Sequence, residues 1–117
     1  GVEFDTGSLG HGLGIACGLA FSAKIDKKKY KVFALISDGE LYEGSVWEAL
    51  RYIEEYNVDN MEIYVNANGW ACYDPVDVEY LERRCKAFLP RIHFHKTDVN
   101  SYFPLHTIAS FQRKITN

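Results

Sequence analysis

The residues best suited to chemistry in this sequence are an aspartate and an asparagine, each placed directly after a predicted strand. Asp38 follows a short apolar run, and Asn68 follows the next such run along the chain. Consecutive strands usually lie close together, and open parallel sheets bind ligands at the carboxyl ends of their strands. A carboxylate and an amide oxygen suit octahedral Mg²⁺, together with a backbone carbonyl, water and phosphate oxygens. The two side chains therefore predict a magnesium site at one edge of a sheet.

A glycine-rich segment offers the other half of a phosphate site. Residues 6–18 contain five glycines, and small or apolar residues continue to about Lys24. This pattern predicts a loop that enters a tightly packed helix, and backbone N–H groups of such a loop bind phosphate. A diphosphate would then lie between the metal and the loop. Asp-Gly and Asn-Gly are also common turns, so the two dipeptides alone favour ordinary loops over a metal site.

The elements that would position these residues alternate between strand and helix. Strands are predicted at 31–36, 61–65 and 92–96, and helices over the end of the glycine-rich segment and at 44–56, 77–88 and 104–115. Asp77 is a candidate N-cap, and Leu89-Pro90 ends the helix that it begins. This alternation predicts an α/β fold, with a parallel sheet and helices on both faces. We expect one domain spanning residues 1–117, which is a common size for a single domain.

Composition excludes several classes of function. The net charge of −3 argues against nucleic acid as a partner, because phosphate backbones bind basic surfaces. No apolar run approaches the length of a membrane span. The three cysteines are odd in number and form no CxxC motif, so a reducing, cytoplasmic setting is expected.

Three segments resemble the transketolase family, in the order in which that family has them. The segment 6–14 (TGSLGHGLG) is similar to the family's glycine loop, and 37–49 (SDGELYEGSVWEA) is similar to its GDGE-xxEG-xxWEA. The segment 60–69 (NMEIYVNANG) is similar to its DNL-strand-DxNG. The last two make a thiamine-diphosphate signature, in which Ser37 replaces the first glycine. The resemblance covers residues 1–70 well and then thins.

This resemblance implies a fold and a role for particular residues. The fold is the thiamine-diphosphate-binding type, in part. The Asp38 and Asn68 side chains and the Trp70 main-chain carbonyl would bind Mg²⁺. Gly39 would contact the diphosphate of the cofactor through its backbone.

Four further residues are assigned by the same resemblance. Gly7 and Leu9 would line thiamine diphosphate, near its pyrimidine and diphosphate. Glu43 takes the place of a glutamate at the family's subunit interface that links paired active sites. His11 would position cofactor or substrate rather than transfer a proton.

The implied activity is transfer of a two-carbon ketol unit between sugar phosphates. The family completes its site with a pyrimidine-binding domain or subunit, and this sequence contains no counterpart of that domain or of an upstream histidine-bearing segment. We therefore expect a fragment or a split subunit, at least dimeric as a homo- or hetero-oligomer, that holds half of an active site and no catalytic residue.

Other interpretations remain open. The chain could be another thiamine-diphosphate enzyme, such as a deoxyxylulose-phosphate-synthase-like or sugar-modifying enzyme, although the TGSLG and WEA segments argue against the first. A truncated, non-catalytic protein with the cofactor fold is a different class. A nicotinamide site is disfavoured because GxGxxG fails at Ile15 or Cys17. His93 and His95 share a strand face, which is more typical of exposed histidines than of a metal pair.

Overall fold

The computed structural model describes residues 2–71 and 74–97 as a parallel sheet packed against helices. The main elements are α1 (His11–Ile25), β1 (Val32–Ser37), α2 (Gly44–Glu55), β2 (Met61–Ala67), α3 (Val78–Phe88) and β5 (His93–Lys96). A short 3₁₀ helix, η1 (Gly39–Tyr42), follows β1, and a small hairpin of β3 (Trp70–Ala71) and β4 (Asp74–Pro75) follows β2. The helix predicted at 104–115 lies outside the described residues.

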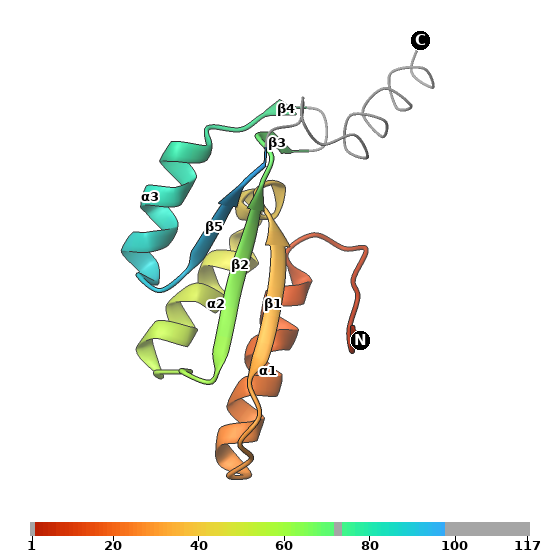
Figure 1. Cartoon of the computed structure of the whole chain (residues 1–117), viewed down its shortest axis with the longest axis vertical. Helices are drawn as coiled ribbons and strands as arrows, with labels where there is room; N and C mark the ends of the chain where they lie inside the picture. Colours follow the sequence, from red (N-terminus) through yellow and green to blue (C-terminus); the bar gives the residue numbers. More distant parts are fainter. Residues whose placement is uncertain (1, 72–73, 98–117) are drawn as a thin grey trace.

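The sheet brings the ends of β1 and β2 to the same edge. Its strand order is β1-β2-β5, and both neighbouring pairs are parallel. Ser37 at the end of β1 pairs with Asn66 in β2, so the residues that follow both strands emerge side by side. The predicted α/β class and parallel sheet are confirmed (Figure 1).

The described helices cover one face of the sheet. Buried and exposed positions alternate along β1 and β2, which is the pattern of a sheet packed on one side. The buried side chains form one core with all three α-helices, and Figure 1 shows α1 and α2 behind the strands. On the other face, Phe33 is 66% exposed and Leu35 is 76% exposed. The sequence predicted helices on both faces of the sheet. Among the described residues, helices cover only one of the two faces.

Small residues allow α1 to lie close to the sheet and to α2. The buried positions of α1 are occupied by one leucine and otherwise by small side chains, namely Leu13, Ala16, Cys17, Ala20 and Ala23. This confirms the close packing expected from the sequence. The first turn of α1 lies near the edge of the sheet where β1 ends, since Gly10 donates a hydrogen bond to Glu40.

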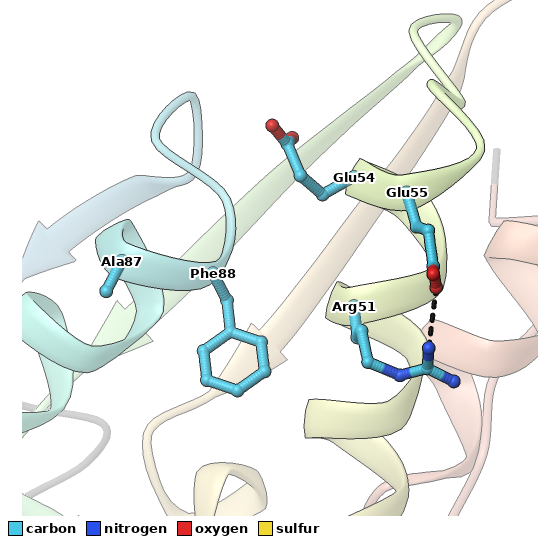
Figure 2. Close-up of a pocket in the computed structure, with 5 residues that line it drawn as sticks. All are labelled: Arg51, Glu54, Glu55, Ala87 and Phe88. Carbon is cyan, nitrogen blue, oxygen red and sulfur yellow. Dashed lines mark hydrogen bonds and ion pairs between the residues drawn. The ribbon is translucent and has the colours of Figure 1, made fainter.

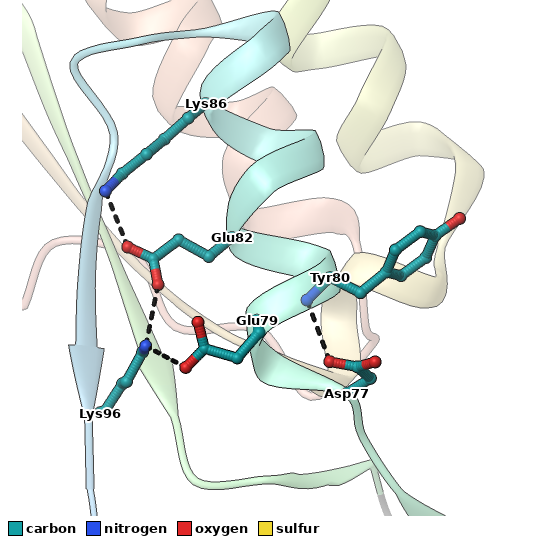
Figure 3. A network of polar contacts seen from close by, with 6 residues as sticks. All are labelled: Asp77, Glu79, Tyr80, Glu82, Lys86 and Lys96. Carbon is teal, nitrogen blue, oxygen red and sulfur yellow. Dashed lines mark hydrogen bonds and ion pairs between the residues drawn. The ribbon is translucent and has the colours of Figure 1, made fainter.

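Polar contacts attach α3 to β5 (Figure 3). Asp77 accepts a hydrogen bond from the Tyr80 N–H at 3.0 Å, which confirms the predicted N-cap. The ammonium group of Lys96 lies 2.5 Å from Glu79 and 3.1 Å from Glu82, and Lys86 lies 2.7 Å from Glu82. The hydrogen bonds that Glu82 accepts from Lys86 and Lys96 lower the pKa of Glu82, and those that Lys96 donates to Glu79 and Glu82 raise the pKa of Lys96.

We predict that Glu82→Gln lowers the melting temperature at pH 7 by a few degrees in low salt, because it breaks a network rather than one exposed pair. The contribution of Glu82 to the free energy of unfolding is present above its unfolded-state pKa of about 4.3. It is lost as the pH falls through the lower pKa that Glu82 has in the folded state. The difference in melting temperature between the unaltered chain and Glu82→Gln should therefore shrink in acid and in molar salt. Glu54→Gln, an exposed change on α2, is the control in thermal unfolding followed by circular dichroism. A difference that persists in molar salt would contradict the ionic origin.

Candidate functional site

Asp38 is the only charged residue that is fully buried within the described part of the chain. It follows β1 and caps η1, so the end of a buried strand fixes its position. Its Oδ1 accepts the Gly39 N–H at 3.0 Å, and its Oδ2 accepts the Gly69 N–H at 2.7 Å. The second bond ties Asp38 to the loop after β2, as the sequence predicts.

Burial and backbone hydrogen bonds act in opposite directions on the pKa of the Asp38 carboxyl group. Burial raises the pKa of this carboxyl group, while hydrogen bonds from Gly69 and Gly39 lower it less strongly. None of the salt bridges among residues 2–71 and 74–97 involves Asp38. A buried carboxylate without a cationic partner is costly. The site therefore fits a divalent cation.

The loop after β2 supplies further oxygen atoms beside Asp38. Asn68 Oδ1 accepts the Trp70 N–H at 2.9 Å, and Gly69 has a left-handed φ of 81°. A Cβ added at Gly39 would lie 3.7 Å from the Trp70 carbonyl oxygen and 3.2 Å from Ala71 Cα. The predicted ligands Asp38, Asn68 and Trp70 therefore belong to one small region. Its carboxylate, amide and carbonyl oxygens are a donor set that suits Mg²⁺.

The first turn of α1 offers a place for an anion. Its N-cap residue is Gly10, no side chain caps it, and no acidic residue lies in its first turn. The first N–H groups of a helix have no partner within the helix, and the helix dipole makes this end positive. A phosphate group is the kind of ligand that such an end binds.

Two side chains that the sequence analysis did not single out connect the start of α1 to the segment around Asp38. Glu40 accepts hydrogen bonds from the backbone of both Gly10 and Ser37. Ser45 donates to the Gly10 carbonyl at 3.0 Å. Both lie in the segment 37–49, so the motif contained the signal, but only the fold shows that they contact the glycine loop.

The remaining predicted residues lie on the exposed side of this region. Gly7, Leu9, His11 and Glu43 are all exposed, and Leu9 is 42% exposed. Space around Gly7 is open, with no neighbour within 4 Å of a Cβ added there. Glu43 precedes α2, and its Cβ lies against Gly10. Their exposure leaves them accessible to a ligand, and their assigned roles remain predictions.

Two other features carry no comparable chemistry. A shallow groove of about 340 Å³ is lined by Arg51, Glu54, Glu55, Ala87 and Phe88, at the C-terminal ends of α2 and α3 (Figure 2). Those ends lie at the edge of the sheet opposite Asp38. His93 stacks on Tyr64 and lies 3.0 Å from Glu62 Oε2. Both His93 and His95 are exposed, and no group of three His, Cys, Asp or Glu in the described ranges could hold a metal.

Comparisons with known proteins identify the family that this chain resembles. A family described as 1-deoxy-D-xylulose-5-phosphate synthase matches residues 2–108. The chain is 44% identical over 92 residues to transketolases of Pongo abelii and Homo sapiens, and 46% identical to transketolase-like protein 2 of Mus musculus. Each match covers 74% of this chain and 15% of the relative, so the chain spans about a seventh of these relatives' length. None of the helices described has both the length and the apolar character of a membrane span.

Proposed function

The chain belongs to the family of 1-deoxy-D-xylulose-5-phosphate synthase and transketolase, and we propose that it is the part of a transketolase that binds Mg²⁺ and the diphosphate of thiamine diphosphate. The family uses this cofactor, and the fold is part of its cofactor-binding domain. Four residues are proposed to bind the metal and the diphosphate, and they are Asp38, Gly39, Asn68 and Trp70.

One observation supports this proposal above the others. The Asp38 carboxylate is fully buried, forms no salt bridge within the described residues, and accepts the N–H of Gly69 beside Asn68. A structural carboxylate in such a place would be expected to pair with lysine or arginine. A divalent cation would supply that charge, and phosphate oxygens would complete its coordination.

Each of the proposed site residues has a physical task. Asp38 and Asn68 bind the metal with their side-chain oxygens, and Trp70 does so with its carbonyl. Gly39 packs closely against the loop after β2, where a Cβ would lie 3.2 Å from Ala71 Cα, and its backbone would contact the diphosphate. Gly7 and Leu9 line the cofactor from the glycine loop. The cofactor itself supplies the electron sink that breaking a carbon–carbon bond requires.

The proposed reaction transfers a two-carbon ketol unit between sugar phosphates. A pyrimidine-binding domain or subunit completes the site, and the assembly is at least a dimer. Glu43 is exposed at the start of α2, where it can meet that partner. His11 is exposed in the first turn of α1 and would position cofactor or substrate.

We predict that a pyrimidine-domain subunit is captured by this chain only when Mg²⁺ and thiamine diphosphate are both present, because the cofactor bridges the two parts. The measurement is a pull-down with the tagged chain, followed by an assay of ketol transfer between sugar phosphates on the recovered complex. Asp77→Ala, which alters a helix cap away from the site, is the control and should leave capture unchanged. Cofactor-independent capture, or a complex without activity, would favour a non-catalytic scaffold.

The matched family gives a second candidate within the same class. Its description is 1-deoxy-D-xylulose-5-phosphate synthase, whereas the relatives reported above are transketolases. Product analysis of the same complex separates the two. Formation of 1-deoxy-D-xylulose 5-phosphate would favour the synthase, and exchange of ketol units between sugar phosphates would favour transketolase.

A further inference from the structure

Glu40 joins Gly10 and Ser37, which lie 27 residues apart in the sequence (37 − 10). Its Oε1 accepts the Gly10 N–H at 3.2 Å. Its Oε2 accepts the Ser37 N–H at 2.8 Å and the Ser37 hydroxyl at 3.3 Å. Ser37 directly precedes Asp38, and Gly10 directly precedes α1. One half-buried carboxylate therefore connects the metal side of the candidate site to its helix side.

Gly10 is held from its other side as well. Its carbonyl accepts a hydrogen bond from Ser45 Oγ at 3.0 Å. It is buried and has a φ of +83°, and a Cβ there would lie 2.6 Å from Ser45 Oγ and 2.8 Å from Glu43 Cβ. Both backbone polar groups of Gly10 are thus bound by side chains of the segment 40–45, and the close packing prevents it from shifting.

The position of α1 at the site depends on this contact. Because the helix has neither a side-chain cap nor an acidic first turn, its first N–H groups face the sheet edge without a partner from the helix itself. Hydrogen bonds to a carboxylate are stronger than neutral ones. Loss of the carboxylate would leave the N–H groups of Gly10 and Ser37 without an acceptor and would free the first turn to move.

We propose that Glu40 is a positioning residue that holds the first turn of α1 at a fixed place relative to Asp38, so that a metal-bound diphosphate meets its N–H groups. The inference rests on the proposed function. Glu40 binds neither the metal nor the diphosphate, and it acts through Gly10 and Ser37.

The negative charge of Glu40 makes this role testable by the sign of an effect. A carboxylate beside an anion site repels the anion, so removing its charge alone would strengthen diphosphate binding. A positioning role predicts the opposite result. In Glu40→Gln the side chain keeps its length and one oxygen, but its amide group opposes one of the two N–H groups.

The experiment titrates the full chain with Mg²⁺ alone and with Mg²⁺ plus inorganic diphosphate, and follows backbone amide resonances by NMR. We expect Glu40→Gln to weaken diphosphate binding about tenfold, the lower end of the loss seen when a supporting contact is removed. Its Mg²⁺ affinity without diphosphate should stay within about twofold. Ser45→Ala, which keeps the charge and releases only the Gly10 carbonyl, should also weaken diphosphate binding, but less. Glu48→Gln, an exposed change on α2, should alter neither affinity.

Each other outcome has a definite meaning. Unchanged or tighter diphosphate binding in Glu40→Gln would overturn the positioning role, and so would an equal loss of Mg²⁺ affinity, which would indicate general damage to the fold. If Glu40→Gln does not fold, the Ser45→Ala result decides, and unchanged diphosphate binding there would overturn the inference. If the unaltered chain shows no response to Mg²⁺ and diphosphate, the proposed function itself fails. Equally strong binding of diphosphate by all variants would overturn the inference about Glu40 but not the proposed function.

Discussion

Replacing Asp38 with alanine should weaken Mg²⁺-dependent binding of thiamine diphosphate by at least about a hundredfold, since even supporting residues around a metal contribute tenfold or more. The variant loses the only buried carboxylate of the described residues, and with it the charge that is proposed to hold the cation beside Asn68. The measurement is the rise in melting temperature caused by Mg²⁺ and cofactor together. A ligand at a hundred times its dissociation constant stabilises the folded state by about 2.7 kcal/mol.

The control for this experiment is Asp77→Ala, because both aspartates accept backbone N–H groups at the start of a helix. Asp77→Ala removes a cap from α3 but should keep the full response to Mg²⁺ and cofactor. An Asp38→Ala protein that still responds like the unaltered chain would contradict the assigned ligand. A matching loss in Asp77→Ala would show that the response reports folding rather than binding.

Replacing Gly10 with alanine should destabilise the fold by about 2 to 4 kcal/mol, from the left-handed backbone and from overpacking. Gly10 has a φ of +83°, and the new Cβ would lie 2.6 Å from Ser45 Oγ and 2.8 Å from Glu43 Cβ. Glu43 Cβ cannot move without shifting the backbone at the start of α2, and the Ser45 hydroxyl can move only by losing its hydrogen bond to the Gly10 carbonyl. Chemical denaturation gives the free energy of unfolding directly.

Gly14→Ala is the matched control for Gly10→Ala. Gly14 lies within α1, is exposed, and has open space where the Cβ would go. Alanine is the better helix former by up to about 1 kcal/mol, so this variant should be as stable as the unaltered chain or more so. If Gly10→Ala proved as stable as Gly14→Ala, the close packing of the glycine loop against residues 43–45 would be wrong.

The sequence was sufficient to predict the elements that carry the metal ligands. The apolar runs place strands at 31–36 and 61–65, and the structure has β1 at Val32–Ser37 and β2 at Met61–Ala67. Both strands continue past their apolar residues because Ser37 and Asn66 still pair across the parallel ladder. Such pairing depends on the neighbouring strand, so hydrophobic pattern alone places the strand ends too early.

The contacts between distant segments were beyond the reach of sequence pattern. Glu40 lies in a motif that the sequence analysis quoted, yet its bond to Gly10 exists only because α1 packs beside β1. The sequence analysis predicted no strand where the hairpin of β3 and β4 lies, since strands of two residues have no periodicity to detect. The run in β1 is apolar throughout, so it predicts burial on both faces, whereas Phe33 and Leu35 are exposed in the described structure.

The most direct test of the cofactor assignment is calorimetric titration of thiamine diphosphate, with Mg²⁺, into this chain alone and into its mixture with a pyrimidine-domain subunit. Binding to the chain alone should be weak, because half of the contacts are missing while the entropic cost of association remains. We predict heat that strengthens with the partner and disappears in Asp38→Ala. Absence of Asp38-dependent heat in both settings would contradict the cofactor assignment and leave a non-catalytic protein with this fold.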